Sequence, residues 1–154
     1  MAHPSRSTPG DSRFSHSFDT LRELAQDVLA YAKTRSASAC EVDISDGFGQ
    51  SVTVRCGEIE TIEYNRDKSI AVTAYLGQHK GQASTSVFAA SALRETVDAA
   101  IDIARFTAAD PCAGLPDVDR LALDFDRHPD LDLHHPWLLS VDQAVEVAHR
   151  CEQA

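Results

Sequence analysis

The alternation of apolar and polar residues predicts a sheet in the middle of the chain. Val52 and Val54 fall on one face of a strand, and Ile70, Val72 and Ala74 fall on one face of another, because successive side chains of a strand point to opposite sides. Turn-forming clusters at roughly ten-residue spacing separate these segments, as in antiparallel strands joined by short hairpins. The expected strands are residues 40–45, 50–55, 58–64 and 69–76, with a weaker fifth at residues 82–85.

One of these strands fits the alternation badly. In residues 58–64, Ile59 and Ile62 would fall on opposite faces. A bulge, or a strand buried on both faces, would explain both positions. The hairpin turns are expected where glycine and polar residues cluster, because such residues tolerate the backbone conformations of tight turns. These clusters are residues 46–49, 56–57, 65–68 and 77–81.

Two amphipathic helices are expected, one before the strands in the sequence, at about residues 19–34, and one after them, at about residues 89–106. Their apolar residues recur with the i, i+3, i+4, i+7 spacing of a helix face that packs on a core. Two such helices can cover one face of one sheet. The apolar stripes are Leu21, Leu24, Ala25, Val28, Leu29 and Ala32 in the first helix, and Leu93, Val97, Ala100, Ile101 and Ala104 in the second.

The helix starts are less regular than the helix faces. Thr20 and Glu23 have the spacing of a capping box, in which each side chain satisfies a free backbone N–H. The second helix lacks an obvious cap, and the hydroxyl oxygens of Ser86 and Ser91 are the candidate acceptors for its first backbone N–H groups. A third helical pattern begins near Val141.

The predicted fold class is therefore α+β, with a mostly antiparallel sheet of four to five strands covered by two helices. Residues 1–17 are rich in serine and polar residues and are expected to form a disordered tail. Residues 18–106 form the domain. Prolines interrupt residues 107–140, which are expected to be a linker rich in Pro and Asp. Residues 141–154 would begin a helix that leads into a further domain.

The net negative charge of the chain bears on which classes of partner it can bind. The formal net charge is −10, and residues 107–154 hold ten Asp or Glu against three Arg and no Lys. Such a surface does not favour phosphate groups, so no nucleic-acid partner is expected. There is no apolar run of about 18 residues that would span a membrane and no apolar secretory signal, so we expect a cytoplasmic protein with reduced thiols. Cys40 and Cys56 are expected to lie on strand faces as small hydrophobes.

Three stretches together carry a family resemblance: residues 40–85, residues 93–117 (LRETVDAAIDIARFTAADPCAGLPD) and residues 130–136 (DLDLHHP). In their order of turns and charged positions they resemble the amino-terminal domain of the PmbA/TldD family, and the PmbA branch, also named TldE, most closely. The likeness extends over about residues 18–154. One departure is Ala89 and Ala90, where the family usually places Ser-Pro at the start of a helix.

The resemblance implies a subunit of a cytoplasmic bacterial zinc peptidase. A TldD-type partner would carry the metal-binding HExxxH helix, and the PmbA-type subunit would lack it. Members of the family are several times longer than this chain, and the helical pattern after Val141 has no stop signal. We therefore expect the chain to be the front part of a longer protein.

No group of residues in this chain has the spacing of a known catalytic site. The glycines of residues 77–81 lack the Lys-Ser/Thr of a P-loop, and no G-x-S-x-G turn is present. Aspartates and histidines gather in one acidic stretch, but prolines interrupt it and its spacing fits neither an EF-hand nor HExxH. A solvated loop is the main interpretation of that stretch, with adventitious metal binding as the alternative. Its members are Asp124, Asp126, His128, Asp130, Asp132, His134 and His135.

We accordingly expect no catalytic, metal-binding or cofactor-binding residue here, and one weaker candidate for contact with a peptide. Gln82, Ala83, Ser84 and Thr85 are small or polar residues after a hairpin, so their strand would be thin and closely approachable. An extended peptide could add to this edge through main-chain hydrogen bonds. The alternative is an edge that is simply blunted by polarity.

The function implied by the resemblance is that of a non-catalytic PmbA-type subunit in a TldD/PmbA peptidase that matures peptide precursors. Its expected partners are a TldD-type subunit that holds the zinc and an unfolded peptide substrate, with self-association as a second option. The rival is a non-enzymatic interaction module, such as a regulator linked to DNA gyrase through protein contacts.

Overall fold

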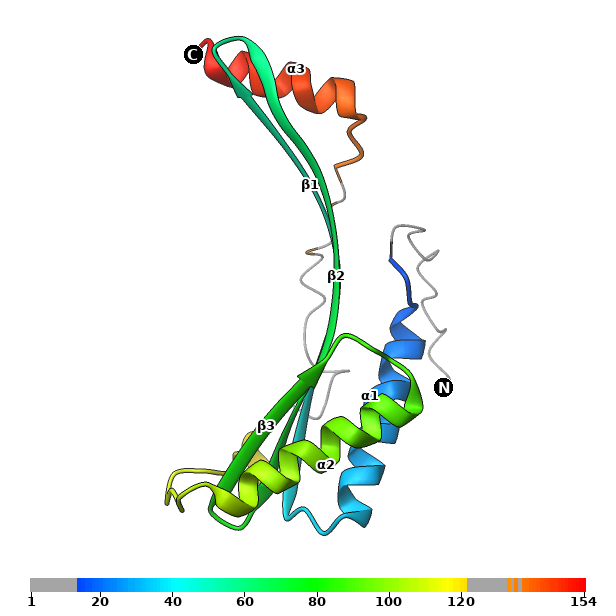
Figure 1. Ribbon diagram of the computed structural model, residues 1–154, viewed down its shortest axis with the longest axis vertical. Coiled ribbons are helices and arrows are strands. Elements are labelled where there is room, and N and C mark those ends of the chain that lie inside the picture. The colour runs from blue at the N-terminus through cyan, green and yellow to red at the C-terminus, as the bar shows by residue number, and fades with distance from the viewer. Residues whose placement is uncertain (1–13, 122–132, 134, 136) are drawn as a thin grey trace. The chain divides into compact units, whose positions relative to one another are not determined.

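The computed structural model describes residues 14–121, 133, 135 and 137–154, which form an α+β fold (Figure 1). It divides into two compact units: the described residues up to Phe48 with Arg66–Leu115, and Gly49–Asn65 with the described residues from Pro116 onward. In the part of the chain described, no helix is both long and apolar enough to cross a bilayer. The elements are α1 (Phe18–Thr34), β1 (Ala39–Arg55), β2 (Glu58–Leu76), β3 (His79–Thr85), α2 (Ala90–Phe106), the 3-10 turn η1 (Val118–Arg120) and α3 (Val141–Glu152).

The three strands form one sheet in the order β1, β2, β3. β2 and β3 are antiparallel, with Ile70 opposite Thr85 at one end and Leu76 opposite His79 at the other. Only two residues separate the strands at the closed end, and the first of them, Gly77, has φ 63°. Glycine suits this position because a side chain is strained at such a φ.

The first hairpin is much longer than the sequence predicts. β1 and β2 are joined by Cys56 and Gly57, whose φ angles of 54° and 78° fit the two-residue type I′ turn that suits twisted strands. The turns expected at residues 46–49 and 65–68 do not form, because each of these segments lies inside a continuous strand. The prediction of four to five strands is therefore wrong, and the sheet has three. Residues 40–45 and 50–55 belong to β1, and residues 58–64 and 69–76 belong to β2.

Gly47 and Gly49 explain why the turn prediction failed, since glycine permits a turn without requiring one. Neither glycine has a positive φ, so both take a backbone conformation open to any residue. The neighbouring Asp46 is engaged elsewhere: its carboxylate accepts hydrogen bonds from the backbone N–H groups of Ser15 and His16, each at 3.1 Å. Residues 46–49, which resemble a turn, are therefore part of β1, and Asp46 among them holds the segment before α1.

The core lies between β2 and the two helices α1 and α2. The two predicted helices are confirmed within one residue at each end. The whole apolar stripe of α2 is buried, whereas in α1 only Val28 and Ala32 are buried and Leu29 is exposed. Each fully buried aliphatic side chain stabilises the fold by about 1.5–3 kcal/mol. The central cluster consists of Val28, Ala32, Ile70, Val72, Ala74, Leu93, Val97, Ala100 and Ile101.

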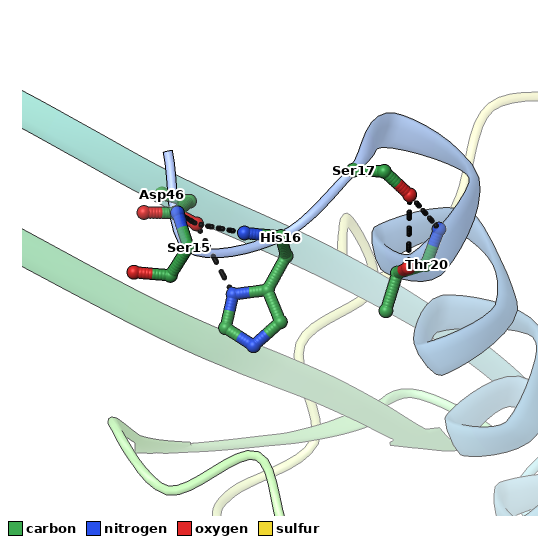
Figure 2. A network of polar contacts seen from close by, with 5 residues as sticks. All are labelled: Ser15, His16, Ser17, Thr20 and Asp46. Carbon is green, nitrogen blue, oxygen red and sulfur yellow. Dashed lines mark hydrogen bonds and ion pairs between the residues drawn. The ribbon is translucent and has the colours of Figure 1, made fainter. Parts of the chain in front are cut away.

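The helix caps differ from the predictions. Ser17, and not Thr20, caps α1: its hydroxyl oxygen accepts a hydrogen bond from the Thr20 backbone N–H at 3.1 Å (Figure 2). The capping box predicted at Thr20 and Glu23 is therefore wrong, because the helix begins at Phe18 and Thr20 lies inside its first turn. The N-cap of α2 is Ala89, which makes no side-chain hydrogen bond, so neither candidate serine serves there.

The cysteines occupy different environments. Cys40 is half-buried in β1, and burial, followed by the adjacent Glu41 carboxylate, raises the pKa of its thiol. A thiol with a raised pKa is a poor nucleophile near neutral pH. Cys56 was expected on a strand face, but it lies exposed in the turn between β1 and β2.

Gly81 allows α2 to approach β3 closely. A Cβ at this position would overlap the backbone carbonyl oxygen of Ala100 and the backbone nitrogen of Ala104. The sequence suggests that this glycine ends a hairpin turn, but it lies within β3 and is buried. Its lack of a side chain sets the distance between helix and sheet, so the packing of α2 depends on it.

Gly81→Ala should destabilise the fold by about 1–3 kcal/mol, because the backbone of α2 cannot give way as a flexible side chain would. Urea unfolding followed by circular dichroism measures this as a lower midpoint. The matched control is Gly49→Ala, also within a strand, where a Cβ meets nothing within 4 Å. Equal midpoints for Gly81→Ala and the unmodified protein would contradict the close packing described here.

Candidate peptide-docking edge

The four residues predicted to contact a peptide, Gln82, Ala83, Ser84 and Thr85, are the last four residues of β3. β3 is an edge strand, since the sheet order places it beside β2 alone among the described strands. The weak fifth strand of the sequence prediction is therefore real and begins earlier than expected, at His79.

Backbone groups along β3 alternate between β2 and the open side. Leu76 and His79 flank a two-residue turn, so they form a hydrogen-bonded pair, and the residues bonded to β2 then follow at every second position. Lys80, Gln82 and Ser84 therefore direct their N–H and C=O groups away from β2.

The segment after α2 already occupies the beginning of this edge. The Thr107 hydroxyl donates a hydrogen bond to the Lys80 carbonyl oxygen at 2.9 Å, which agrees with the outward direction of that carbonyl. His79 Nδ1 lies 2.7 Å from the Thr107 carbonyl oxygen, so this histidine is engaged in a structural contact. Among the described residues, the outward positions that remain are Gln82 and Ser84.

Side chains along the edge divide into two kinds. Gln82 and Ser84 are exposed, whereas Ala83 and Thr85 are half-buried on the side of the helices. The Thr85 hydroxyl oxygen accepts a hydrogen bond from the Val87 backbone N–H at 3.1 Å, so it belongs to the turn toward α2. The edge can thus offer main-chain hydrogen bonds at two residues, flanked by small side chains that do not obstruct a peptide.

Ser15, His16 and Asp46 bring together the residue types of a serine hydrolase, but not its geometry (Figure 2). His16 Nδ1 lies 3.1 Å from the Asp46 carboxylate, whose side chain is only 3% exposed. The Ser15 hydroxyl points away from the imidazole in Figure 2, and the imidazole ring packs against Phe88 with centroids 5.0 Å apart. A nucleophilic serine needs a hydrogen bond to its base. This cluster therefore anchors the segment before α1.

The family resemblance implies zinc in a TldD-type partner and none in this chain, and that absence stays a prediction. Among the described residues, no group of three or more His, Cys, Asp or Glu side chains gathers as a metal ion would require. Of the acidic stretch, only His135 is described, and the six other named members lie outside the described residues. The interpretation of that stretch as a solvated loop thus stays a prediction.

A groove of about 410 Å³ lies between α1 and α2, and the sequence analysis did not predict it. Its lining is mostly apolar, with Asp27 and Arg94 as charged residues, and the Arg94 guanidinium lies over the Tyr31 ring at 5.6 Å. Tyr31 and Phe88, which line it, are outside the predicted stripes and are the signal that could have revealed it. The groove offers apolar contact and one charge of each sign, which suits binding more than catalysis.

Comparison with known proteins identifies the relatives of this chain. The family described as PmbA/TldA metallopeptidase domain 1 matches residues 40–104. The metalloprotease PmbA of Escherichia coli O157:H7 is 45% identical over 134 residues, which is 87% of this chain and 29% of that protein. The PmbA homologue of Haemophilus influenzae is 41% identical over 121 residues, which is 79% of this chain and 26% of that protein. This chain thus spans less than a third of the length of these relatives.

A solved structure shares the fold. It is a protein from Bacteroides thetaiotaomicron described as a candidate modulator of DNA gyrase, with a TM-score of 0.60 and 22% identity over 66% of this chain and 23% of that one. At this identity the likeness concerns the fold alone. The sequence matches extend through β1, β2, β3 and α2, the elements that build the sheet and its helical cover. The chain therefore belongs to the PmbA/TldD metallopeptidase family, as an amino-terminal domain of the PmbA branch.

Proposed function

We propose that this chain is the amino-terminal domain of a non-catalytic subunit in a TldD/PmbA-type zinc peptidase. The observation that carries the proposal is the 45% identity to a metalloprotease PmbA over 87% of the chain. In this role the domain contributes structure and peptide contact, while a TldD-type partner with HExxxH supplies zinc and the general base. Zinc in that partner would activate the water that attacks the peptide bond.

The chemistry of the described side chains is consistent with a domain that binds peptide while its partner supplies zinc and the general base. His79 is bonded to a backbone carbonyl, and His16 is held by a buried carboxylate without a bonded nucleophile. The open positions Gln82 and Ser84 instead offer backbone groups, which bind an extended chain with little regard to its sequence. Such binding suits a complex that trims unfolded peptide precursors in the cytoplasm.

The rival function is a non-enzymatic module linked to DNA gyrase. Its support is the description of the structural neighbour, and a likeness at 22% identity shows a common fold and carries no argument about activity. The relatives with higher sequence identity carry the name metalloprotease. We therefore favour the peptidase subunit.

Peptide cleavage should require both subunits and zinc. This chain, within the longer subunit to which its relatives correspond, should co-purify with a TldD-type protein, and the complex should cleave an unfolded peptide that neither subunit cleaves alone. A chelator should abolish cleavage, and zinc should restore it. Elemental analysis of this chain alone should show well below one zinc per molecule.

Chelator-resistant cleavage by this chain alone would contradict the proposal, as would a tightly held stoichiometric zinc. The matched control is a complex whose TldD-type subunit carries a Glu→Gln change in HExxxH, which should assemble but not cleave. Assembly with gyrase subunits, and none with a TldD-type protein, would favour the rival.

Ser84→Pro should weaken peptide binding by the complex without unfolding the domain. Proline removes the outward N–H of Ser84, whereas the hydrogen bonds between β3 and β2 are made by the alternate residues. Loss of this one hydrogen bond to the peptide should raise KM by about two- to tenfold and change kcat less. Ser84→Ala, which keeps the N–H, is the matched control. Equal KM values for the two variants would contradict contact at this edge.

A further inference from the structure

The strand β2 has a second open edge, away from the candidate site on β3. β3 pairs with β2 only between Ile70 and Leu76. The sheet order leaves no other described strand on that side of β2, so residues 58–65 have β1 on one side and no strand on the other. These residues are exposed throughout. A row of backbone N–H and C=O groups in this position is a template for another strand.

The burial of residues 58–65 differs from one explanation that the sequence pattern suggests. One explanation for Ile59 and Ile62 was a strand buried on both faces, and this is wrong, because their exposed fractions are 49% and 41%. A bulge stays a prediction. By alternation, Ile59 shares a face with Glu63, and Ile62 shares the other face with Glu58 and Glu60. Each face of the strand thus presents an aliphatic side chain beside carboxylates.

Among the described residues, the carboxylates along this edge take part in one ion pair. Glu60 lies 3.6 Å from Arg55, in an exposed pair that contributes little. Glu58 and Glu63 have no ion-pair partner among the described residues. At the turn end of the strand, the Glu152 carboxylate accepts a hydrogen bond from the Gly57 N–H at 2.8 Å and adds a further negative charge. An occupant of this edge would therefore gain from basic side chains.

We propose that the open edge of β2 along residues 58–65 binds an extended polypeptide strand that carries Lys or Arg on both faces with aliphatic residues between them. Backbone hydrogen bonds to β2 hold the strand. Basic side chains lie opposite Glu58, Glu60 and Glu63, and aliphatic side chains cover Ile59 and Ile62. Opposite charges and aliphatic pairs across neighbouring strands both stabilise a sheet.

A second copy of this chain is a poorer occupant. Pairing of two such edges would gather six carboxylates, and the ion pair with Arg55 engages one of them, Glu60, in each copy. Like charges across a strand pair are destabilising.

The proposal does not depend on the peptidase role, because it concerns binding by this chain without cleavage. The probe is the fluorescently labelled peptide KVRTVKTRG, which as a strand places basic residues and valine on each face. Its anisotropy should rise on titration with the full chain at low salt and rise less at about 0.5 M salt, where surface charges are screened. The acidic counterpart EVETVETEG should not bind. A version of KVRTVKTRG with alternate backbone nitrogens methylated should lose binding as well.

The double variant Glu58→Gln with Glu63→Gln removes two negative charges and should weaken binding of KVRTVKTRG by about fivefold. The matched control is Glu95→Gln, an exposed change on α2, which should leave binding unchanged. Amide chemical shifts should change within residues 58–65 and not at Gln82 or Ser84, which separates this edge from the candidate site on β3.

Three outcomes would overturn the proposal. The first is equal binding of the acidic and basic peptides, and the second is amide shifts confined to Gln82 and Ser84. The third is a dimer in sedimentation analysis that the double variant strengthens, because that result would show a second copy to be the occupant. Failure of any of these tests leaves the zinc-dependent cleavage assay unaffected, so the two proposals fail separately.

Discussion

The close contact of α2 with β3 at Gly81 is the constraint on which the rest of the domain depends. With no side chain at Gly81, the helix backbone at Ala100 and Ala104 can rest almost directly on the strand. At that distance Val97 and Ile101 reach the apolar face of β2 and become fully buried. A larger residue at any of the small positions would lift the helix and open the core, since protein interiors are packed too densely to absorb the change.

The two open edges differ in length and in the chemistry of their side chains. β3 is short, and Thr107 engages its first outward carbonyl, so its remaining edge is a small polar surface at Gln82 and Ser84. β2 continues for twelve residues, 58–69, before its pairing with β3 begins at Ile70. Its edge is acidic and aliphatic. Under the two proposals, the domain holds one extended chain with little sequence preference at β3 and another by its charge at β2.

Local periodicity made some of this predictable from the sequence. The stripes that include Val28 and Val97 mark helix faces because the spacing of core residues is set by the helix itself. Turn and cap positions were harder. Residues 46–49 look like a turn but lie in β1, and Cys56 adopts a φ of 54° that its residue type does not suggest.

The edge of β3 was predicted, and the edge of β2 was not. Strand length depends on which distant segments pair, and no local sequence pattern indicates where the pairing of β3 with β2 ends. The alternation failure at Ile59 and Ile62 was the available signal. A bulge or burial on both faces would explain that failure, and burial is wrong because both side chains are exposed.

Native-state hydrogen exchange tests most directly whether the stable core is confined to the region that α2 covers. The account predicts that the amides of Val72 and Val97 exchange only through global unfolding, while the slowest amides within residues 58–65 exchange through a much cheaper local opening. Equal opening free energies at these positions would contradict it.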